Sequence, residues 1–357
     1  MFTQILSRSV GERIRSSRLV DLLTGPHGVD RYTELVDPTL VLGDGRARVV
    51  AARRTTPRSV TVTLAPNAAF TAAHRVRAGQ HVTVTVEIDG RRHTRCYSPA
   101  NAEDAEHLEI TVGRHDRGVV SGYLYEHAEP GMVVGLGGPA GEFVLPAAPP
   151  QRILFVAGGS GITPVMAMLR TLRATGYRGT AALLYYSRTA AEACYADELA
   201  VMPAVRVLHV HSRGAGGDLA GRFGPDHVGA ALPEPDLVYV CGPNALADAV
   251  REQYPSAVSE SFTPPQVVAP TEPSGGRISF ARSGVDAVDT GRNLLEQAEA
   301  AGLSPKHGCR MGICHACTCR KTSGVVMNVT TGAVSSADAD DIQICVSVPV
   351  GDVEIAL

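Results

Sequence analysis

At 357 residues the chain is longer than the roughly 100 to 200 residues usual for one domain, so we expect two or three domains. Its hydrophobic fraction of 44% and charged fraction of 19% are those of a folded globular protein, which excludes a largely disordered chain. The net charge of -3 shows no large excess of one sign, which argues against a nucleic-acid-binding protein.

No apolar run reaches the roughly 20 residues that a transmembrane helix needs, because residues 153–169 are interrupted by three glycines and a proline. Residues 1–23 contain four arginines but lack the compact apolar core and cleavage site of a secretory signal. We therefore expect a cytoplasmic protein without a transmembrane segment. A peripheral contact with a membrane, made through its partner, stays open.

The first part of the chain predicts a helical segment followed by an antiparallel domain. Residues 1–42 place apolar side chains at helical spacing and are expected to form a helical N-terminal extension. Residues 43–148 contain short alternating β-rich runs, such as 60–64 and 81–86, separated by turn residues. This pattern is typical of a small antiparallel β-barrel.

Strand and helix patterns then alternate through residues 149–262. The expected strands are at 153–157, 181–186, 205–209 and 237–240, and the expected helices are near 164–175, 190–200 and 244–254. Such alternation predicts an α/β domain with a parallel sheet.

The C-terminal part of the chain predicts a linker and a third domain. Residues 263–276 hold four prolines and two glycines and are expected to be the linker. A third domain follows at 277–357, with a strand at 277–281, a helix near 291–301 and a final strand at 352–357.

Four of the eight cysteines lie between positions 309 and 319, which is the clustering of metal ligands rather than of a disulfide framework and indicates a reducing compartment. The spacing is C-x4-C-x2-C with a further cysteine downstream, as in a plant-type 2Fe-2S site. A structural zinc site would use paired C-x2-C knuckles. Cys319 is expected to be a bystander. The predicted metal ligands are Cys309, Cys314, Cys317 and Cys345.

On these cysteines, residues 276–357 resemble a plant-type ferredoxin domain. The resemblance implies an α+β domain of β-grasp fold that carries the cluster near its surface.

In the barrel segment, Arg95-Cys96-Tyr97-Ser98 resembles the R-x-Y-S flavin signature of the ferredoxin-NADP reductase superfamily. An arginine can neutralise a pyrophosphate, a tyrosine can stack on a flavin ring, and a serine hydroxyl can hydrogen-bond near the flavin N5. A second element resembles the phosphate-binding helix start of the same family, and residues 138–143 resemble the turn that closes its barrel. The second element comprises Gly118, Val119, Val120 and Ser121.

The second domain opens with a glycine-rich turn between a strand and a helix, where small residues can admit a pyrophosphate. The turn is not G-x-G-x-x-G; it resembles the G-G-x-G-I-T-P loop of the same superfamily. Its residues are Gly158, Gly159, Ser160, Gly161, Ile162 and Thr163. Downstream, Cys241, Gly242 and Pro243 resemble the C-G-P motif that approaches the nicotinamide, and Glu260 resembles an acidic residue that assists proton movement near the flavin.

The nucleotide preference is predicted from the end of the strand at 181–186. Ser187 and Arg188 follow it, and a hydroxyl with a guanidinium can pair with a 2′-phosphate, whereas an NAD site favours an acidic residue there. We therefore expect NADPH, with NADH as the alternative.

The order flavin barrel, nucleotide domain and 2Fe-2S domain resembles oxygenase and desaturase reductases, the type that includes the electron-transfer partner of stearoyl-CoA 9-desaturase. This implies an oxidoreductase with FAD, NADPH and a 2Fe-2S cluster, in which Ser98, Cys241 and Glu260 are the catalytic residues. Such a chain converts two-electron into one-electron transfer for a di-iron desaturase or hydroxylase, or for a cytochrome P450. The alternatives are an FMN-containing dioxygenase reductase and a non-catalytic redox carrier or sensor.

Overall fold

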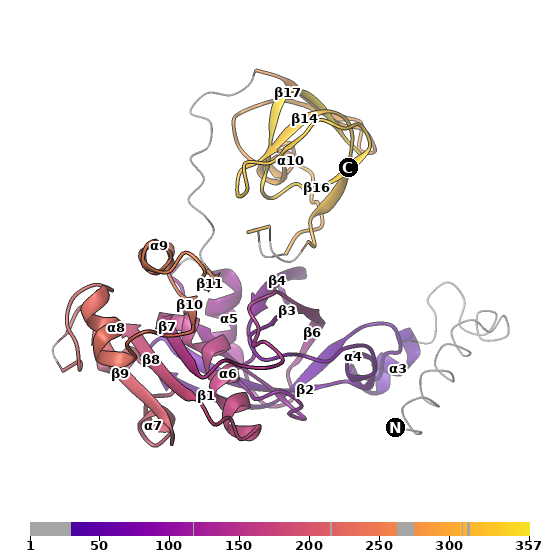
Figure 1. Cartoon of the computed structure of the whole chain (residues 1–357). Helices are drawn as coiled ribbons and strands as arrows, with labels where there is room; N and C mark the ends of the chain where they lie inside the picture. Colours follow the sequence, from indigo (N-terminus) through magenta and orange to yellow (C-terminus); the bar gives the residue numbers. More distant parts are fainter. Residues whose placement is uncertain (1–29, 117, 215, 263–274, 309, 313–314) are drawn as a thin grey trace. The chain divides into compact units, whose positions relative to one another are not determined.

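The computed structural model describes residues 30–116, 118–214, 216–262, 275–308, 310–312 and 315–357 (Figure 1). The chain divides into two compact units: the first comprises residues up to His93 and Tyr97–Phe262, and the second comprises Thr94–Cys96 and the C-terminal part that follows Phe262. The apolar run expected to be helical in residues 1–23 lies outside the described residues, and the first described helix is α3 (Asp30–Val36). Within the described ranges, each helix is too short or too polar to cross a lipid bilayer.

The first unit begins with a six-stranded antiparallel sheet in the order β4-β3-β6-β1-β2-β5. Apolar side chains alternate along its strands, as in the buried Val60, Val62 and Leu64 of β2, and helices α4 and α5 pack on the same core. The predicted antiparallel domain is confirmed. Its elements are β1 (Arg46–Thr56), β2 (Ser59–Pro66), α4 (Ala68–Ala73), β3 (His81–Ile88), β4 (Arg91–Tyr97), β5 (Leu108–Gly113), α5 (Val119–His127) and β6 (Val133–Ala140).

The same unit continues with a five-stranded sheet, β11-β10-β7-β8-β9, in which every paired strand is parallel, as predicted. Helices α6 and α7 pack on one face and α8 and α9 on the other, because successive residues of β7 alternate between two buried clusters. The elements are β7 (Arg152–Gly158), the 3-10 turn η2 (Gly159–Gly161), α6 (Ile162–Ala174), β8 (Thr180–Ser187), the 3-10 turn η3 (Ala190–Glu192), α7 (Ala196–Ala200), β9 (Val205–His211), α8 (Pro225–Ala231), β10 (Leu237–Cys241), α9 (Asn244–Gln253) and β11 (Val258–Glu260).

The predicted helix at 190–200 is wrong in detail. A 3-10 turn and the short helix α7 replace it, and Tyr195 between them has a left-handed φ of 60°. The Tyr195 hydroxyl lies 2.5 Å from Thr111 Oγ1 of β5, and Cys194 is buried, so contacts distant in sequence fix the break.

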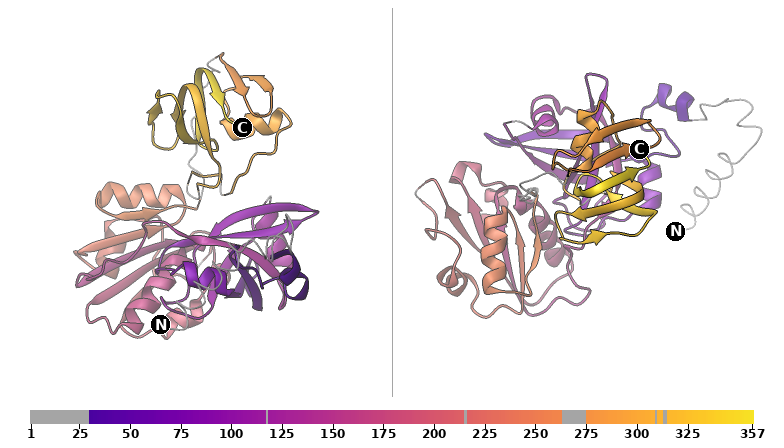
Figure 2. Two further views of the ribbon diagram at one scale, coloured as in Figure 1. Left: turned by 90° about the vertical axis from the view of Figure 1, so that its right-hand side faces the viewer. Right: turned by 90° about the horizontal axis from the view of Figure 1, so that it is seen from above.

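The strands of each sheet have a core of their own, and the core of the parallel sheet also takes in residues of the antiparallel domain. Ala100, Phe143 and Leu145 from the antiparallel part pack in the same cluster as Met166 and Tyr239 of the parallel part. The Tyr239 hydroxyl donates to the carbonyl of Val144 at 2.7 Å, and its ring meets that of Phe143 edge-on. The two domains of the first unit therefore pack against each other (Figures 1 and 2).

The second unit is a mixed sheet with one helix. Strands follow the order β13-β12-β17-β14-β15, β16 pairs with β14, and β12 and β17 run parallel. Helix α10 packs on this sheet through Leu294, Leu295 and Ala298. The predicted α+β class is confirmed. Its elements are β12 (Arg277–Phe280), β13 (Val285–Val288), α10 (Leu294–Ala300), β14 (Thr318–Asn328), β15 (Val334–Ser335), β16 (Asp340–Gln343) and β17 (Ser347–Ile355).

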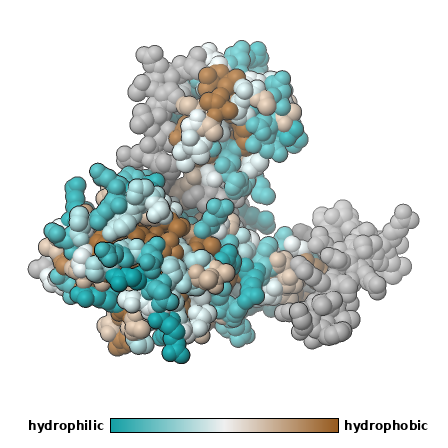
Figure 3. Space-filling model, in the orientation of Figure 1, coloured by the Kyte–Doolittle hydropathy of each residue, from teal (hydrophilic) through white to brown (hydrophobic). Residues whose placement is uncertain are grey.

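The surface of both units is mainly hydrophilic on the face shown in Figure 3. In the second unit even a buried cation is paired: Lys321 Nζ donates to the carbonyls of Gly324 and Ala337, at 2.7 and 2.5 Å. Pairing of this kind is the rule for buried polar groups, so an exception marks a position of interest.

Candidate active site

The end of strand β4 carries the predicted flavin signature. Tyr97 is the last residue of β4, Arg95 lies two positions before it, and Ser98 follows it. Ser98 is buried, and its Oγ has no hydrogen-bond partner among the described residues. Since buried hydroxyls are nearly always paired, this atom fits a site that is completed by a bound group such as the predicted flavin.

Helix α5 begins at the second predicted flavin element. Gly118 is its N-cap and no side chain caps the first turn, which fits backbone N–H groups that receive an anion. A Cβ atom at Gly118 would lie 2.3 Å from Ser121 Oγ and 2.9 Å from His115 Cβ, so a larger residue there would displace these side chains. Ser121 Oγ accepts from the His115 N–H and donates to the Gly118 carbonyl, both at 3.3 Å, so this hydroxyl serves the turn itself. Val120 is buried and Val119 is exposed.

The predicted nucleotide loop and the C-G-P motif lie against each other. A Cβ at Gly161 would be 2.1 Å from the Cys241 carbonyl oxygen, and one at Gly158 would be 2.7 Å from Pro243 Cδ. Gly242 is restricted in the same way by the backbone of Gly158, at 3.0 Å. The contact between the two loops therefore requires glycine at position 161, and it leaves little room for a side chain at positions 158 and 242.

The other residues of this loop lead into helix α6. Gly159 differs from the three packed glycines: its added Cβ would meet open space, but its φ of +55° favours glycine. Gly159 and Ser160 are exposed, whereas Ile162 and Thr163 are buried at the start of α6. The exposed pair at a helix start fits a pyrophosphate.

Cys241 and Glu260 stand side by side at the carboxyl edge of the parallel sheet. They are the last residues of β10 and β11 and are partners in the strand register. Burial raises the pKa of the Cys241 thiol well above its ordinary value, and the negative charge of Glu260 raises it further. The thiol is therefore neutral at physiological pH.

A histidine that the sequence analysis missed joins this edge. His81, the first residue of β3, is buried, and its Nδ1 lies 3.6 Å from Glu260 Oε1. Gly141, with a φ of +103°, lies against both side chains. The sequence holds no local signal for the pair, because the antiparallel and parallel domains contribute one residue each.

The predicted 2′-phosphate residues lie at the end of β8. Arg188 is exposed there. Ser187 is buried; its Oγ donates to the Thr189 carbonyl at 3.0 Å and lies 2.9 Å from His211 Nδ1 of β9. His211 is a second residue that the sequence analysis missed, although its place at a strand end could have indicated it.

Two of the four predicted cluster ligands, Cys309 and Cys314, lie outside the described residues. Cys317 and Cys345 are both buried in the core of the second unit, and the Ile344 N–H donates to the Cys317 carbonyl at 3.4 Å, which brings their segments together. Among the described residues there is no group of three or more possible metal ligands. Two neighbouring buried thiols fit half of the donor set of a 2Fe-2S cluster.

The backbone around these cysteines is also suited to a tight loop. Arg310, Gly312 and His315 all have left-handed φ values, of 59°, 75° and 53°. A Cβ at Gly312 would lie 3.0 Å from Val346 Cγ2, next to Cys345. These conformations turn the chain sharply, as a loop that wraps a cluster requires.

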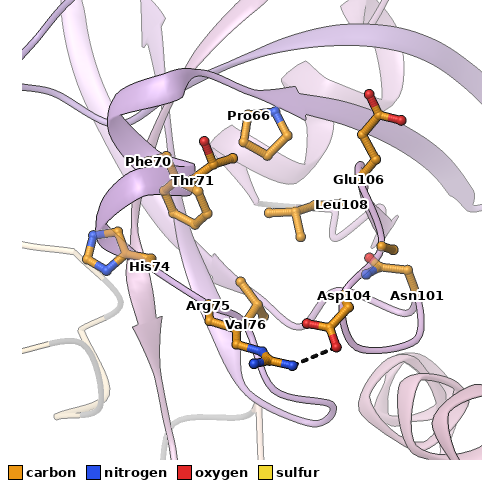
Figure 4. A pocket seen from close by; sticks show the side chains of 11 residues that line it. Pro66, Phe70, Thr71, His74, Arg75, Val76, Asn101, Asp104, Glu106 and Leu108 are labelled. Atoms are coloured by element: carbon orange, nitrogen blue, oxygen red, sulfur yellow. Dashed lines mark hydrogen bonds and ion pairs between the residues drawn. The ribbon is translucent and has the colours of Figure 1, made fainter. Parts of the chain in front are cut away.

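A cavity of about 280 Å³ lies elsewhere in the first unit, between helix α4 and residues 101–108 (Figure 4). Phe70 and Leu108 form its apolar wall, and Arg75 pairs with Asp104 at 2.6 Å across its rim. None of the predicted site residues lines it, so it is separate from the candidate active site.

Comparison with known proteins agrees with this arrangement. The chain matches the families described as oxidoreductase FAD-binding domain over residues 68–145, oxidoreductase NAD-binding domain over 155–252 and 2Fe-2S iron-sulfur cluster binding domain over 280–350.

Several relatives match this chain over most of its length and over most of their own. An NADPH oxidoreductase of Mycobacterium tuberculosis is 32% identical over 92% of this chain and 89% of its own length. The glycine betaine monooxygenase reductase subunit of Pseudomonas aeruginosa is 30% identical over 78% of this chain and 86% of its own. The structure of phthalate dioxygenase reductase has the same fold, with a TM-score of 0.58 and 24% identity over 87% of this chain and 97% of that one.

Three observations agree on the protein family. They are the antiparallel and parallel domains with a buried cluster between them, the C-terminal domain with its cysteines, and the relatives described above. The chain therefore belongs to the ferredoxin-NADP reductase superfamily and is an oxidoreductase with an FAD-binding domain, an NAD-binding domain and a C-terminal 2Fe-2S domain.

Proposed function

We propose that this chain oxidises NADPH and passes the electrons through FAD and the 2Fe-2S cluster to a separate oxygenase or fatty-acyl desaturase. The observation that carries the proposal is the buried cluster in which Ala100, Phe143 and Leu145 of the FAD-binding domain pack against the NAD-binding domain. Hydride transfer requires two rings held in contact, and a buried contact between the two domains supports such an arrangement. The flavin, when bound, supplies two-electron storage, and the cluster supplies one-electron transfer.

The proposed work of the protein at the flavin is binding and orientation. Arg95 neutralises the pyrophosphate together with the N–H groups that follow Gly118, and Tyr97 provides a ring for stacking. The unpaired Ser98 Oγ hydrogen-bonds to the flavin ring. Cys241 contributes a small neutral thiol next to the nicotinamide, and Glu260 holds or releases the proton at its carboxylate.

The preference for NADPH is proposed from the end of β8. Arg188 is exposed there and can pair with a 2′-phosphate, while the buried Ser187 hydroxyl is bonded to His211 and fixes the turn. The Mycobacterium tuberculosis relative, named an NADPH oxidoreductase, supports this choice. A comparison of kcat/KM for the two nucleotides tests it, with Arg188→Ala expected to lower the value for NADPH and not for NADH. A preference of the wild type for NADH would reject it.

The partner is proposed from the relatives. The Pseudomonas relative is a reductase subunit of a monooxygenase, which supports an oxygenase acceptor; a di-iron desaturase or hydroxylase and a cytochrome P450 are the other candidates.

The proposed domain limits are 43–148, 149–262 and 277–357, joined by the linker 263–276, with 1–42 as an N-terminal extension. A cytoplasmic location, peripheral to a membrane where the partner is membrane-bound, belongs to the same proposal.

One rapid-mixing experiment tests the core of the proposal. Anaerobic protein loaded with FAD and cluster is mixed with NADPH, and the flavin and cluster absorbances are followed separately. We expect the flavin to be reduced first and the cluster second, and cytochrome c to be reduced only by cluster-loaded protein. A flavin that stays oxidised in the presence of NADPH and NADH would reject the proposal.

A further inference from the structure

Helix α3 meets the FAD-binding domain with its polar side. Residues four positions apart lie on the same side of a helix, so Asp30 and Glu34 share one side, and Asp37, directly after the helix, continues it. Glu34 pairs with Arg46 of β1 at 2.9 Å, and Asp37 pairs with Arg48 of β1 at 2.6 Å. Ion pairs with a strand of the antiparallel sheet therefore hold this side of α3 against the domain.

The apolar side of α3 is turned to the outside. Leu35 and Val36 are 81% and 83% exposed, although a surface helix normally turns such side chains toward the core. The chain then returns to the start of the helix, where the Asp30 carboxylate accepts from the Leu42 N–H at 2.7 Å. Five of the eleven exposed large apolar side chains in the described ranges fall within residues 32–42. We call them the α3 apolar face: Tyr32, Leu35, Val36, Leu40 and Leu42.

A group of exposed apolar side chains marks an interaction site, and the chain just before α3 carries a set that matches it. Residues 1–23 place apolar side chains at helical spacing. A helix with such a stripe needs a surface against which to bury it. The apolar side chains are Phe2, Leu6, Val10, Ile14, Leu19, Leu22 and Leu23.

The short link between these residues and α3 favours a return of the chain on itself. Gly25, Pro26 and Gly28 lie within residues 24–29; the proline disfavours a continuous helix, and glycine allows a sharp turn. Connections of about 2 to 8 residues usually join helices that lie antiparallel and side by side. The covalent link also gives the segment an effective concentration on the order of millimolar at α3, which favours it over a separate molecule.

We propose that residues 1–23 cover the α3 apolar face and form with α3 a helical hairpin on the FAD-binding domain. The apolar stripe of the segment is buried against Leu35 and Val36, while the ion pairs of Glu34 and Asp37 anchor the hairpin on β1. None of these residues belongs to the predicted cofactor sites, so the inference does not depend on the proposed function.

Limited proteolysis of the full-length, FAD-loaded protein tests the contact. Trypsin cleaves after arginine, and residues 1–23 contain four such sites: Arg8, Arg13, Arg15 and Arg18. A covered segment is cleaved only when it detaches, and aspartate on the face should detach it. Mass spectrometry should therefore show these N-terminal fragments released at least about tenfold more slowly from the wild type than from the double variant Leu35→Asp/Val36→Asp.

Three further variants show whether the effect belongs to this contact. Val201→Asp places the same charge at a 78% exposed valine of the NAD-binding domain and should release the fragments at the wild-type rate. Leu35→Met keeps an apolar side chain of similar volume and should stay protected. Leu6→Asp/Ile14→Asp changes the opposite side of the contact and should be cleaved as fast as the double variant of α3.

The outcomes distinguish the possible occupants of the face. Protection that persists over about a hundredfold dilution and is lost in Leu35→Asp/Val36→Asp supports the hairpin. Equal cleavage of the wild type and this variant would overturn the inference. Protection lost on dilution, with a dimer in sedimentation that the variant does not form, would assign the face to a second copy and overturn it as well. So would a wild type that floats with vesicles of phosphatidylcholine and phosphatidylglycerol when the variant does not, since the face would then meet a lipid surface.

Discussion

Arg170 of helix α6 joins the FAD-binding and NAD-binding domains, and its removal should weaken the whole first unit. Its guanidinium donates to both carboxylate oxygens of Glu198, at 2.8 and 2.5 Å, to Glu109 of β5 at 2.8 Å, and to the Ala100 carbonyl at 2.9 Å. Burial alone would lower the pKa of Arg170, but the bonds to Glu198 and Glu109 raise it above its ordinary value. We expect Arg170→Ala to leave two carboxylates without their cation.

The magnitude follows from the exposure of the three side chains. Arg170 is 16% exposed, Glu109 26% and Glu198 31%, which is intermediate between a buried and a surface ion pair. Removing one partner costs about 3 to 5 kcal/mol in a buried pair and about 0 to 1 kcal/mol at a surface. We therefore expect a loss of about 2 to 3 kcal/mol, which is about 30- to 150-fold in the ratio of folded to unfolded protein.

Urea unfolding at a fixed excess of FAD measures this loss. The chain has no tryptophan, so flavin fluorescence reports the first unit, and circular dichroism follows the unfolding of the whole chain. The matched control is Arg251→Ala, which breaks an exposed ion pair with Asp248 in the same domain and should cost less than about 1 kcal/mol. In a Glu198→Gln background the cost of Arg170→Ala should fall. Equal losses for Arg170→Ala and Arg251→Ala would refute the reasoning.

Four further outcomes follow. Hydrogen bonding to Arg170 holds the pKa of Glu198 below its ordinary value of 4.5. The loss of stability in Arg170→Ala should therefore be constant at neutral pH and should shrink as the pH falls below 4.5. Urea unfolding at several pH values measures this loss. Gly161→Ala should prevent folding, because the added Cβ would strike the carbonyl oxygen of Cys241. Gly159→Ala should cost only about 1 to 2 kcal/mol, because the added Cβ meets open space and only the positive φ is unfavourable. The yield of folded protein and the urea midpoints measure both losses, and similar losses for the two variants would contradict the prediction. Mapping by mass spectrometry should find Cys241 unlabelled by a thiol reagent at about pH 8 until the chain is unfolded, because its raised pKa keeps it protonated; rapid native labelling would be inconsistent with this. Cys345→Ala should lose its iron yet keep NADPH-dependent ferricyanide reduction, and full iron content would exclude Cys345 as a ligand.

Periodic elements were predictable from the sequence because their signal is local. The alternating runs at 60–64 and 81–86 are strands β2 and β3, and the strands expected at 153–157 and 237–240 are β7 and β10. The alternation of strands and helices along the chain was enough to predict a parallel sheet. It did not predict the strand order β11-β10-β7-β8-β9, because that order depends on which strands become neighbours after each helical connection.

Features that depend on distant contacts were missed. The break at Tyr195 is fixed by Thr111 of another domain, and the pairing of His81 with Glu260 joins two domains that the sequence describes separately. The motifs placed Gly158, Gly161 and Gly242 in their loops, but they held no sign of the close contact between the two loops that also restricts these positions. The assignments of Cys309 and Cys314 stay predictions.

The interlocked glycine loops limit how reductases of this type can be recombined. A chimaera with a crossover between positions 161 and 241 would combine two loops that had not diverged together, and a displacement of a few tenths of an ångström at one would strike the other. A crossover after Phe262, where the first unit ends, separates none of these contacts. Exchange of the 2Fe-2S domain as a whole cassette is thus the tolerant route to a new electron acceptor.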